Sequence, residues 1–163
     1  MMNIENLLQQ TDLGMNSSQV KAFFLGALCA DKPLSFDKAL TELLAEGPEA
    51  RDVLEKDLGA LYEELKKDLG KSLSEMIVDQ KDLRMFVEAN RDQLDYFLTG
   101  LSLAGTNVEN AADEEMAGFI EELEETVEEL DDFMADEDAD DQVALGYKKF
   151  LFETWEEFVA LKR

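Results

Sequence analysis

The chain has 163 residues, of which 45% are hydrophobic and ten are Phe, and this apolar content argues against disorder throughout. Its formal net charge is −24, from 39 acidic and 15 basic residues, so its overall field repels nucleic acids and anionic membranes. One Cys and no His exclude an internal disulfide framework, a Cys-only metal site and the usual neutral-pH general base.

The charge is unevenly distributed along the chain. Residues 1–91 carry 17 acids and 11 bases, residues 92–147 carry 19 acids and no base, and residues 148–163 carry three acids and four bases. A partner that binds through charge is therefore basic or cationic. No apolar run approaches the roughly 18 residues that span a membrane, and no signal sequence opens the chain. Together with the single Cys29, this predicts a soluble cytoplasmic protein with no membrane partner.

The first third of the chain carries clear signals for helix boundaries. The stretch Asn16–Gln19 has the pattern of a capping box, and apolar residues follow it at helical spacing. Ser35 suits the N-cap of a second helix, Gly47 its end, and Pro48 the start of a third.

The third helix carries a leucine-rich stripe. Apolar residues between Leu54 and Leu69 recur mostly in steps of three and four, which predicts one amphipathic helix that ends at Gly70. Residues 70–81 are predicted to form a connection, with one turn around Met76–Val78.

A further helix is predicted from residue 83 onwards, because apolar residues again recur at helical spacing. Its small residues Gly100, Ala104 and Gly105 favour close contact with a neighbouring helix. The segment 106–115 (TNVENAADEE) supplies another cap and places negative charge at a helix start, where the macrodipole favours it.

Two long amphipathic helices are predicted at the end of the chain. The apolar stripe of the first consists of Met116, Phe119, Ile120, Leu123, Val127, Leu130 and Phe133. The stripe of the second consists of Tyr147, Phe150, Leu151, Trp155, Phe158 and Val159. The stretch 134–147 (MADEDADDQVALGY) is interpreted as the hinge between them. No segment shows the alternation of a half-buried strand.

These elements predict an all-α fold, a single-domain helical bundle of six or seven helices that ends in a long antiparallel helix pair. The predicted domain covers residues 1–163. We divide it into an N-terminal helix or arm (1–15), a helical core (16–105) and an acidic helical hairpin (106–163).

The hinge begins with the spacing of a calcium loop. Asp136, Asp138 and Asp140 occupy the first, third and fifth positions of an EF-hand. The sixth position requires Gly but holds Asp141, and the twelfth requires Glu but holds Tyr147. We therefore predict no metal site and interpret the hinge as a solvated acidic connector that caps the following helix. Loose, millimolar-range cation binding by these carboxylates stays open.

The acidic run before the hinge has two interpretations. It is either a polar solvent face made of good helix formers or a binding surface for a basic partner. Glu side chains four residues apart repel each other and no Lys in the run relieves them, which weakens the first interpretation. The predicted partner-binding residues are Glu121, Glu122, Glu124, Glu125, Glu128, Glu129, Asp131, Asp132, Asp136, Glu137 and Asp138.

The sequence offers no catalytic constellation. Cys29 has apolar neighbours and no imidazole partner, which indicates a core thiol and not a nucleophile. No glycine-rich loop could cradle a phosphate, and no carboxylate pair stands apart from the others. Trp155 and the Phe residues have core spacing. We predict no enzyme activity, no catalytic residue and no cofactor, and we keep metal-assisted carboxylate chemistry as a third hypothesis.

Three phrases of the chain occur in a recognisable order. SSQVKAFFLGALCA (17–30) resembles the early helix of the YgfB/YecA-like family of uncharacterised bacterial proteins, and LDYFLTGLSLAG (94–105) resembles its second Gly-containing helix. The acidic segment DEDADDQ (136–142) and the aromatic helix after it resemble a third feature. Together the phrases span about residues 16–160.

The resemblance implies a cytoplasmic, all-helical, self-associating protein with no established enzyme activity. Some relatives carry a Cys-rich metal-binding extension, which LKR at the end of this chain does not match, so no zinc is implied. Packing and corner roles are implied for Phe24, Leu25, Gly26, Leu28, Cys29, Phe97, Leu98, Gly100 and the run Asp136–Asp138.

The leading hypothesis is a non-enzymatic helical regulator that acts through protein–protein contact. Its acidic 109–141 surface would meet a basic patch on a protein, with nucleic-acid-binding proteins as one class of partner and no direct binding of nucleic acid. A homodimer is the second predicted assembly. The alternative is an acidic mimic of duplex DNA, which carries about one charge per 1.7 Å of axis, that inhibits a nucleic-acid-binding enzyme.

Overall fold

The computed structural model describes residues 4–11, 13–77 and 79–162. Within them the chain forms eight α-helices and one 3₁₀ turn and no strand, which confirms the prediction of an all-α fold. The helices are α1 (Ile4–Gln9), α2 (Ser17–Cys29), α3 (Phe36–Leu43), η1 (Pro48–Ala50), α4 (Arg51–Lys67), α5 (Leu69–Ser74), α6 (Leu83–Leu103), α7 (Glu114–Ala135) and α8 (Asp141–Lys162).

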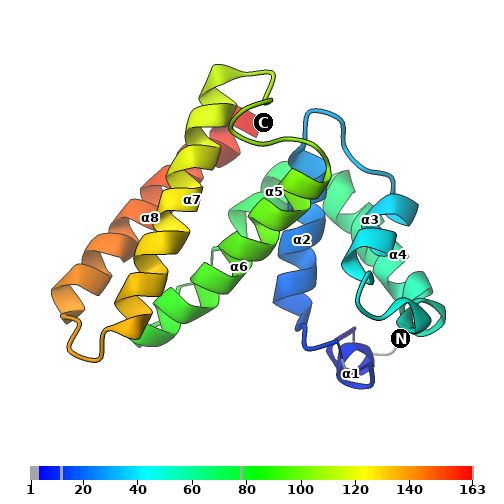
Figure 1. The fold of residues 1–163 in the computed structure, drawn as a ribbon, viewed down its shortest axis with the longest axis horizontal. Coiled ribbons are helices and arrows are strands. Elements are labelled where there is room, and N and C mark those ends of the chain that lie inside the picture. Colours follow the sequence, from blue (N-terminus) through cyan, green and yellow to red (C-terminus); the bar gives the residue numbers. More distant parts are fainter. Residues whose placement is uncertain (1–3, 12, 78, 163) are drawn as a thin grey trace.

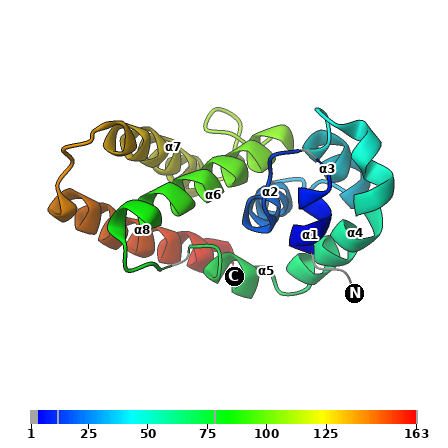
Figure 2. The same ribbon diagram turned by 90° about the horizontal axis from the view of Figure 1, so that it is seen from below.

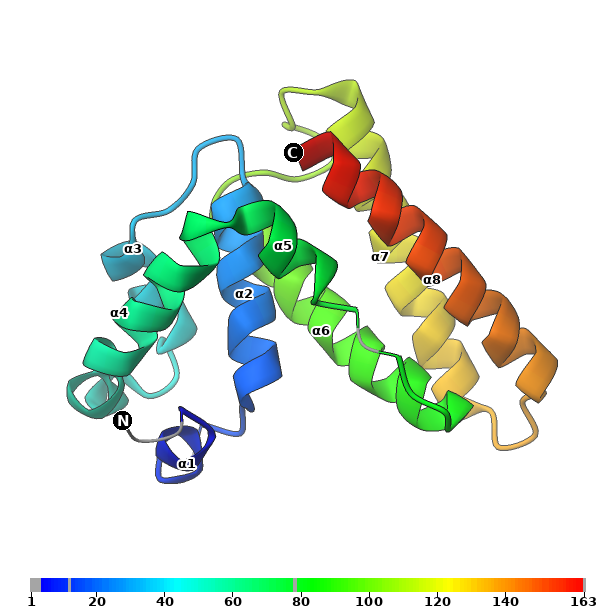
Figure 3. The same cartoon turned by 180° about the vertical axis from the view of Figure 1, so that it is seen from behind.

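Helix α6 runs through the middle of the molecule (Figure 1). The antiparallel pair α7 and α8 packs on one side of it, and α1 to α4 lie on the other side, with α2 directly against α6 (Figures 1 and 2). Short helix α5 contacts both α2 and α8. The view from behind shows it lying across α2 (Figure 3). The predicted antiparallel helix pair is therefore present. The predicted division of the chain at residues 15 and 105 stays a prediction.

Helices α2 and α6 cross with their backbones in contact. A Cβ on Gly26 would lie 2.0 Å from the carbonyl oxygen of Phe97, and a Cβ on Gly100 would lie 2.1 Å from that of Phe23. Both separations are far below a van der Waals contact, so only glycine fits at either position. The close contact predicted for Gly100 is thus confirmed.

Two other small residues of that prediction have different roles. Ala104 is the C-cap of α6, and Gly105 follows it with φ of +92°. The Thr106 N–H donates to the Leu101 carbonyl at 3.1 Å, which closes the helix end in the manner of a glycine-terminated cap. These two residues end the helix, and a Cβ on Gly105 would meet no described atom within 4 Å.

The helix starts predicted at Asn16 and Ser35 are confirmed, whereas α3 ends at Leu43, before the predicted Gly47, and α4 begins at Arg51 and not at Pro48. The Gln19 N–H donates to Asn16 Oδ1 and the Asn16 N–H donates to Gln19 Oε1, both at 2.9 Å, which completes the capping box. Ser35 Oγ accepts from the Lys38 N–H at 3.3 Å, and Pro48 opens the 3₁₀ turn before α4. Each of these signals involves residues within one helical turn.

Helix α5 corrects the prediction for the end of the leucine stripe. Helix α4 stops at Lys67 and a new helix begins at Leu69, so Gly70 lies inside α5 and the segment after it is not simply a connection. The Asp68 side chain accepts from the Lys71 N–H at 3.2 Å, and Leu73 is fully buried. This burial stabilises a helix too short to form alone. The predicted turn at Met76–Val78 includes Val78, which lies outside the described residues.

The α7–α8 hairpin also departs from prediction at two points. The connection is confined to residues 136–140, because 141–147 form the first turns of α8. Phe150, assigned to the buried stripe, is 41% exposed. The predicted stripe residues Leu151, Trp155, Phe158 and Val159 are buried, so Phe150 alone is wrongly assigned to the buried side of α8.

An aromatic cluster joins α8 to α6. Trp155 stacks on Phe158 with ring centroids 5.0 Å apart, and Phe97 of α6 meets Trp155 edge-on at 5.2 Å. The Trp155 Nε1–H donates to the Leu73 carbonyl of α5 at 2.6 Å. Its prediction as a core residue is confirmed, and the cluster fixes the position of α8 beside the acidic helix α7.

Candidate functional site

The predicted partner-binding residues lie on α7 and on the connection to α8. All are solvent-exposed, and at 3.6 residues per turn those on α7 cover roughly half of its circumference, from its α6 edge to its α8 edge. We call them the acidic surface: Glu121, Glu122, Glu124, Glu125, Glu128, Glu129, Asp131 and Asp132 on α7, and Asp136, Glu137 and Asp138 on the connection.

The α6 edge of the acidic surface is neutralised at one position. Arg91 donates from Nε to Asp131 Oδ1 at 2.5 Å and from Nη2 to Oδ2 at 3.2 Å, a two-point pairing that matches guanidinium and carboxylate geometry. These bonds, with a further one to Asp92 at 3.1 Å, raise the pKa of Arg91. Among the described residues, Asp131 is the only member of the acidic surface in an ion pair.

A second arginine of α6 caps the end of α7. Arg84 donates from Nη2 to the Met134 carbonyl at 2.6 Å and from Nη1 to the Asp136 carbonyl at 3.3 Å. Its guanidinium also lies 5.7 Å from the ring centroid of Phe133. The last carbonyls of a helix lack intrahelical partners and carry partial negative charge, so a cation stabilises them. The two arginines therefore hold the C-terminal end of α7 against α6.

The like-charge repulsion expected from the sequence is present at Glu124. Its pKa is raised, first by partial burial and then by the charges of Glu121 and Glu128. Glu124 borders a hollow of about 370 Å³ between α6 and α7, where Leu98 and Val127 contribute apolar surface. Arg91 lies nearer to the N-terminus of α6, so its positive charge does not offset the repulsion at Glu124.

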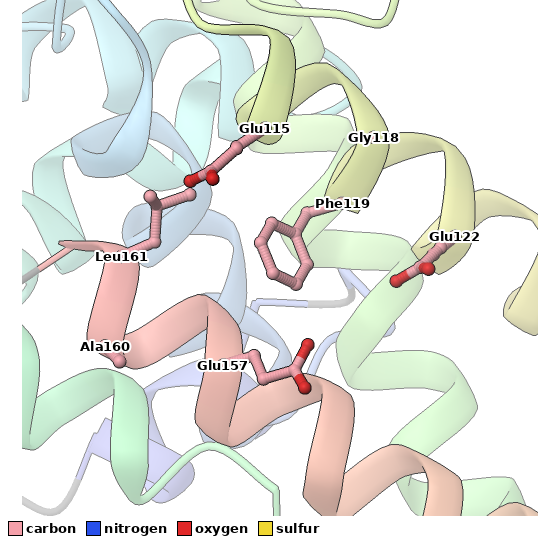
Figure 4. A pocket seen from close by; sticks show the side chains of 7 residues that line it. All are labelled: Glu115, Gly118, Phe119, Glu122, Glu157, Ala160 and Leu161. Carbon is pink, nitrogen blue, oxygen red and sulfur yellow. The ribbon is translucent and has the colours of Figure 1, made fainter.

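The α8 edge of the acidic surface borders a hollow of about 560 Å³ between α7 and α8. Figure 4 shows Phe119 and Glu157 pointing into it from opposite helices, with Glu115 and Glu122 on either side of Phe119 along α7. No base occurs among its described lining residues, which are Glu115, Gly118, Phe119, Glu122, Glu157, Ala160 and Leu161. An aromatic face among carboxylates suits a positively charged side chain.

The predicted list of partner-binding residues omits two carboxylates of this hollow, Glu115, which lies within the acidic 109–141 surface, and Glu157, which lies outside it. Glu157 belongs to segment 148–163, whose charge is slightly positive, so counting charge by segment did not select it. The position of Glu157 could have been predicted from the antiparallel helix pair. Positions equally far from residue 138, the middle of the connection, face each other, which sets Glu157 opposite Phe119.

The connection between α7 and α8 has the geometry of helix caps. Asp136 Oδ1 accepts from the Asp138 N–H at 3.0 Å, and Asp140 Oδ1 accepts from the Gln142 N–H at 2.9 Å. The predicted capping of the following helix is confirmed. Because α8 begins at Asp141, the later positions of a calcium loop are helical. In the described part of the chain, no group of three or more His, Cys, Asp or Glu is placed to hold a metal ion.

Cys29 is a core thiol, as predicted. Its side chain is 1% exposed, and burial raises the pKa of the thiol to about 12, so it is protonated at neutral pH. Lys162 donates from Nζ to the Cys29 carbonyl at 2.9 Å and so links the end of α8 to the end of α2.

Searches with family models, curated proteins and solved structures give no match to this chain. The YgfB/YecA-like resemblance therefore stays a prediction that rests on the three phrases quoted above. Within the described residues, no helix has both the length and the apolar character needed to cross a membrane.

Proposed function

We propose that this protein is a non-enzymatic helical regulator whose acidic surface binds a basic surface on a protein partner. The observation that supports it is that the acidic surface is exposed while its own chain neutralises only Asp131, within the described residues. Arg84 and Arg91 contact α7 near its C-terminal end. Arg84 donates hydrogen bonds to the carbonyls of Met134 and Asp136, and Arg91 donates to the carboxylate of Asp131. The rest of the surface has its charge available to a partner.

Uncompensated carboxylates favour a basic partner in two ways. Each like-charged pair four residues apart destabilises the free helix by a few tenths of a kcal/mol, and a partner's cations relieve this repulsion. The summed field also speeds the encounter with a basic surface. Both effects weaken with salt, since the screening length is about 8 Å at physiological ionic strength.

The charge spacing fits a protein partner better than mimicry of duplex DNA. Helix α7 carries ten acidic residues in 22 positions, a length of about 33 Å at 1.5 Å per residue. This gives one charge per about 3.3 Å, roughly half of the linear density of a duplex. A basic patch of the kind that marks nucleic-acid-binding proteins requires no fixed periodicity. A homodimer would form through another face, because two copies of the acidic surface repel each other.

The proposal is tested by capture from native lysate with the immobilised protein. Partners retained at low salt should be lost at moderate salt, and should also be lost from a variant with Glu→Gln at 121, 122, 124, 125, 128 and 129. A matched control changes six exposed acids of α3, η1, α4 and the turn before η1 to amides, namely Glu42, Glu46, Glu49, Asp52, Glu63 and Glu64. Retention that is equal for both variants and insensitive to salt would contradict the proposal.

A further inference from the structure

A third hollow, of about 620 Å³, lies between α5 and α8, on a face of α8 that adjoins the hollow in Figure 4. We call it the α5–α8 groove. Its lining residues come from α8, from α5 and from the segment just after α5, and they are Ser74, Ile77, Phe152, Glu153, Trp155, Glu156, Glu157, Val159 and Ala160.

The floor of the groove is apolar and held in place. Ile77, Trp155 and Val159 are 6%, 3% and 5% exposed, so the little surface they present opens into the groove. The Trp155 ring is fixed by its hydrogen bond to the Leu73 carbonyl and by the stacked ring of Phe158. A rigid apolar floor of this kind receives an apolar side chain without the entropic cost of ordering the site.

The rim of the groove is acidic. Glu153, Glu156 and Glu157 are exposed, and no base occurs among the described lining residues. Lys148 lies one turn before Phe152, but it is paired with Asp79 at 2.5 Å. The charge around the apolar floor is therefore negative, and complementarity requires a positively charged occupant.

The groove is continuous with the acidic hollow beside α7. Glu157 and Ala160 line both hollows, and Ala160 presents only a methyl group between them. A chain segment that crosses α8 at Ala160 therefore reaches Trp155 on one side and Glu115 and Glu122 on the other. The two hollows can hold one continuous ligand.

We propose that the α5–α8 groove binds an amphipathic, basic segment of a protein partner. The segment inserts an apolar side chain against Trp155 and sets Lys or Arg side chains against Glu153, Glu156 and Glu157. This rests on the proposed function, because it names the kind of segment by which the basic partner is held. A second copy of this chain is the poorer occupant, since it brings a net charge of −24.

The test uses Trp155, the only tryptophan of the chain, as a fluorescent reporter at the site. The probes are two synthetic peptides of about 14 residues. One has Leu on one helical face and Lys on the other, and the second has Ser in place of each Leu at the same charge. The Leu/Lys peptide is expected to shift the emission of Trp155 and, by calorimetry, to bind at least tenfold more tightly than the Ser/Lys peptide.

Two variants locate the binding. Ala160→Phe fills the passage at an exposed position, and Glu153→Gln/Glu156→Gln/Glu157→Gln removes the rim charge. Each is expected to weaken the Leu/Lys peptide at least tenfold, with unchanged helicity by circular dichroism. The matched control Glu46→Gln/Glu49→Gln/Glu63→Gln removes three exposed charges on the far side of α6 and should leave the affinity within twofold.

Equal affinity for the two peptides, an unchanged Trp155 emission, or full binding by Ala160→Phe would each overturn the inference. So would a dimer in sedimentation velocity that Ala160→Phe dissociates, because a second copy would then occupy the groove. The groove can fail as a binding site while the proposed function holds. If lysate partners are lost only on neutralising α7 and not on these α8 changes, the acidic surface stands and the groove does not.

Discussion

The α2–α6 crossing and the α7–α8 hairpin bury their apolar residues through different contacts. At the crossing, backbone meets backbone, and Gly26 and Gly100 leave no space for a single methyl group. In the hairpin, side chains meet across the helices, and the Phe119 and Phe158 rings pack edge-to-face with their centroids 6.0 Å apart. A Cβ on Gly118 of α7 would meet no described atom within 4 Å. The crossing therefore fixes the fold, while the hairpin tolerates a surface selected for charge.

The largest expected effect comes from adding one methyl group at the crossing. Gly26→Ala or Gly100→Ala forces a Cβ into a carbonyl oxygen, and two packed backbones cannot move apart without disturbing their neighbours. We expect a loss of about 3 kcal/mol in the free energy of unfolding for each, measured by urea denaturation.

Gly118→Ala is the matched control in the hairpin. It adds the same methyl group to a helix at an open position and should stabilise the protein by about 0.5–1 kcal/mol, because Ala loses less backbone entropy than Gly. A similar effect of all three substitutions would mean that the two regions do not differ in this way.

Arg84→Met should have the next largest effect. It removes two hydrogen bonds to the carbonyls of Met134 and Asp136 and leaves the end of α7 uncapped, although a methionine keeps contact with Phe133. We expect a loss of about 1.5 kcal/mol. Hydrogen exchange should be faster in the last turn of α7 and unchanged in α2. Equal acceleration in both helices would show that the two regions unfold together.

Arg91→Met tests the ion pair that the acidic surface forms within the described residues. Arg91 is about a quarter exposed and Asp131 about half exposed, so solvent screens the pair and its removal should cost about 0.5–1 kcal/mol. The loss should shrink as salt is raised, unlike the loss for Gly100→Ala. A salt-independent loss would indicate that the arginine acts through packing of its stem.

Helix caps could be predicted from the sequence because both partners of each hydrogen bond lie within one helical turn. The capping box of Asn16 and Gln19 is such a case. Helix α5 could not be predicted as a separate helix, because Leu69 continues the spacing of the leucine stripe. The break at Asp68 depends on the burial of Leu73 by helices distant in the sequence. Phe150 was misplaced because periodicity alone does not show which side of α8 its neighbours cover.

The same division holds for the candidate site. Exposure of the acidic residues follows from the stripe that they flank, so it could be predicted. The ion pair between Arg91 and Asp131 joins residues 40 positions apart in the sequence, so it could not be predicted without knowing how α6 packs against α7. The apolar floor of the α5–α8 groove could not be predicted without the fold, because Ile77 and Trp155 are distant in the sequence.

The smallest expected effect distinguishes repulsion from solvation in the acidic surface. The pKa of Glu124 is raised in the folded protein, mainly by partial burial and then by Glu121 and Glu128. The folded state therefore holds this proton more tightly than the unfolded state does, and ionisation of Glu124 opposes folding above its folded pKa. Glu124→Gln should raise the free energy of unfolding at pH 7 by about 0.2–0.5 kcal/mol. The gain should disappear as the pH falls below the ordinary value of 4.5, where the carboxyl is protonated in both states.

Glu63→Gln, on α4, serves as the control and should show no such gain. If Glu124→Gln instead lowers stability at pH 7, the acidic run is held by its own chain, and the argument that its charge is left for a partner loses its physical basis.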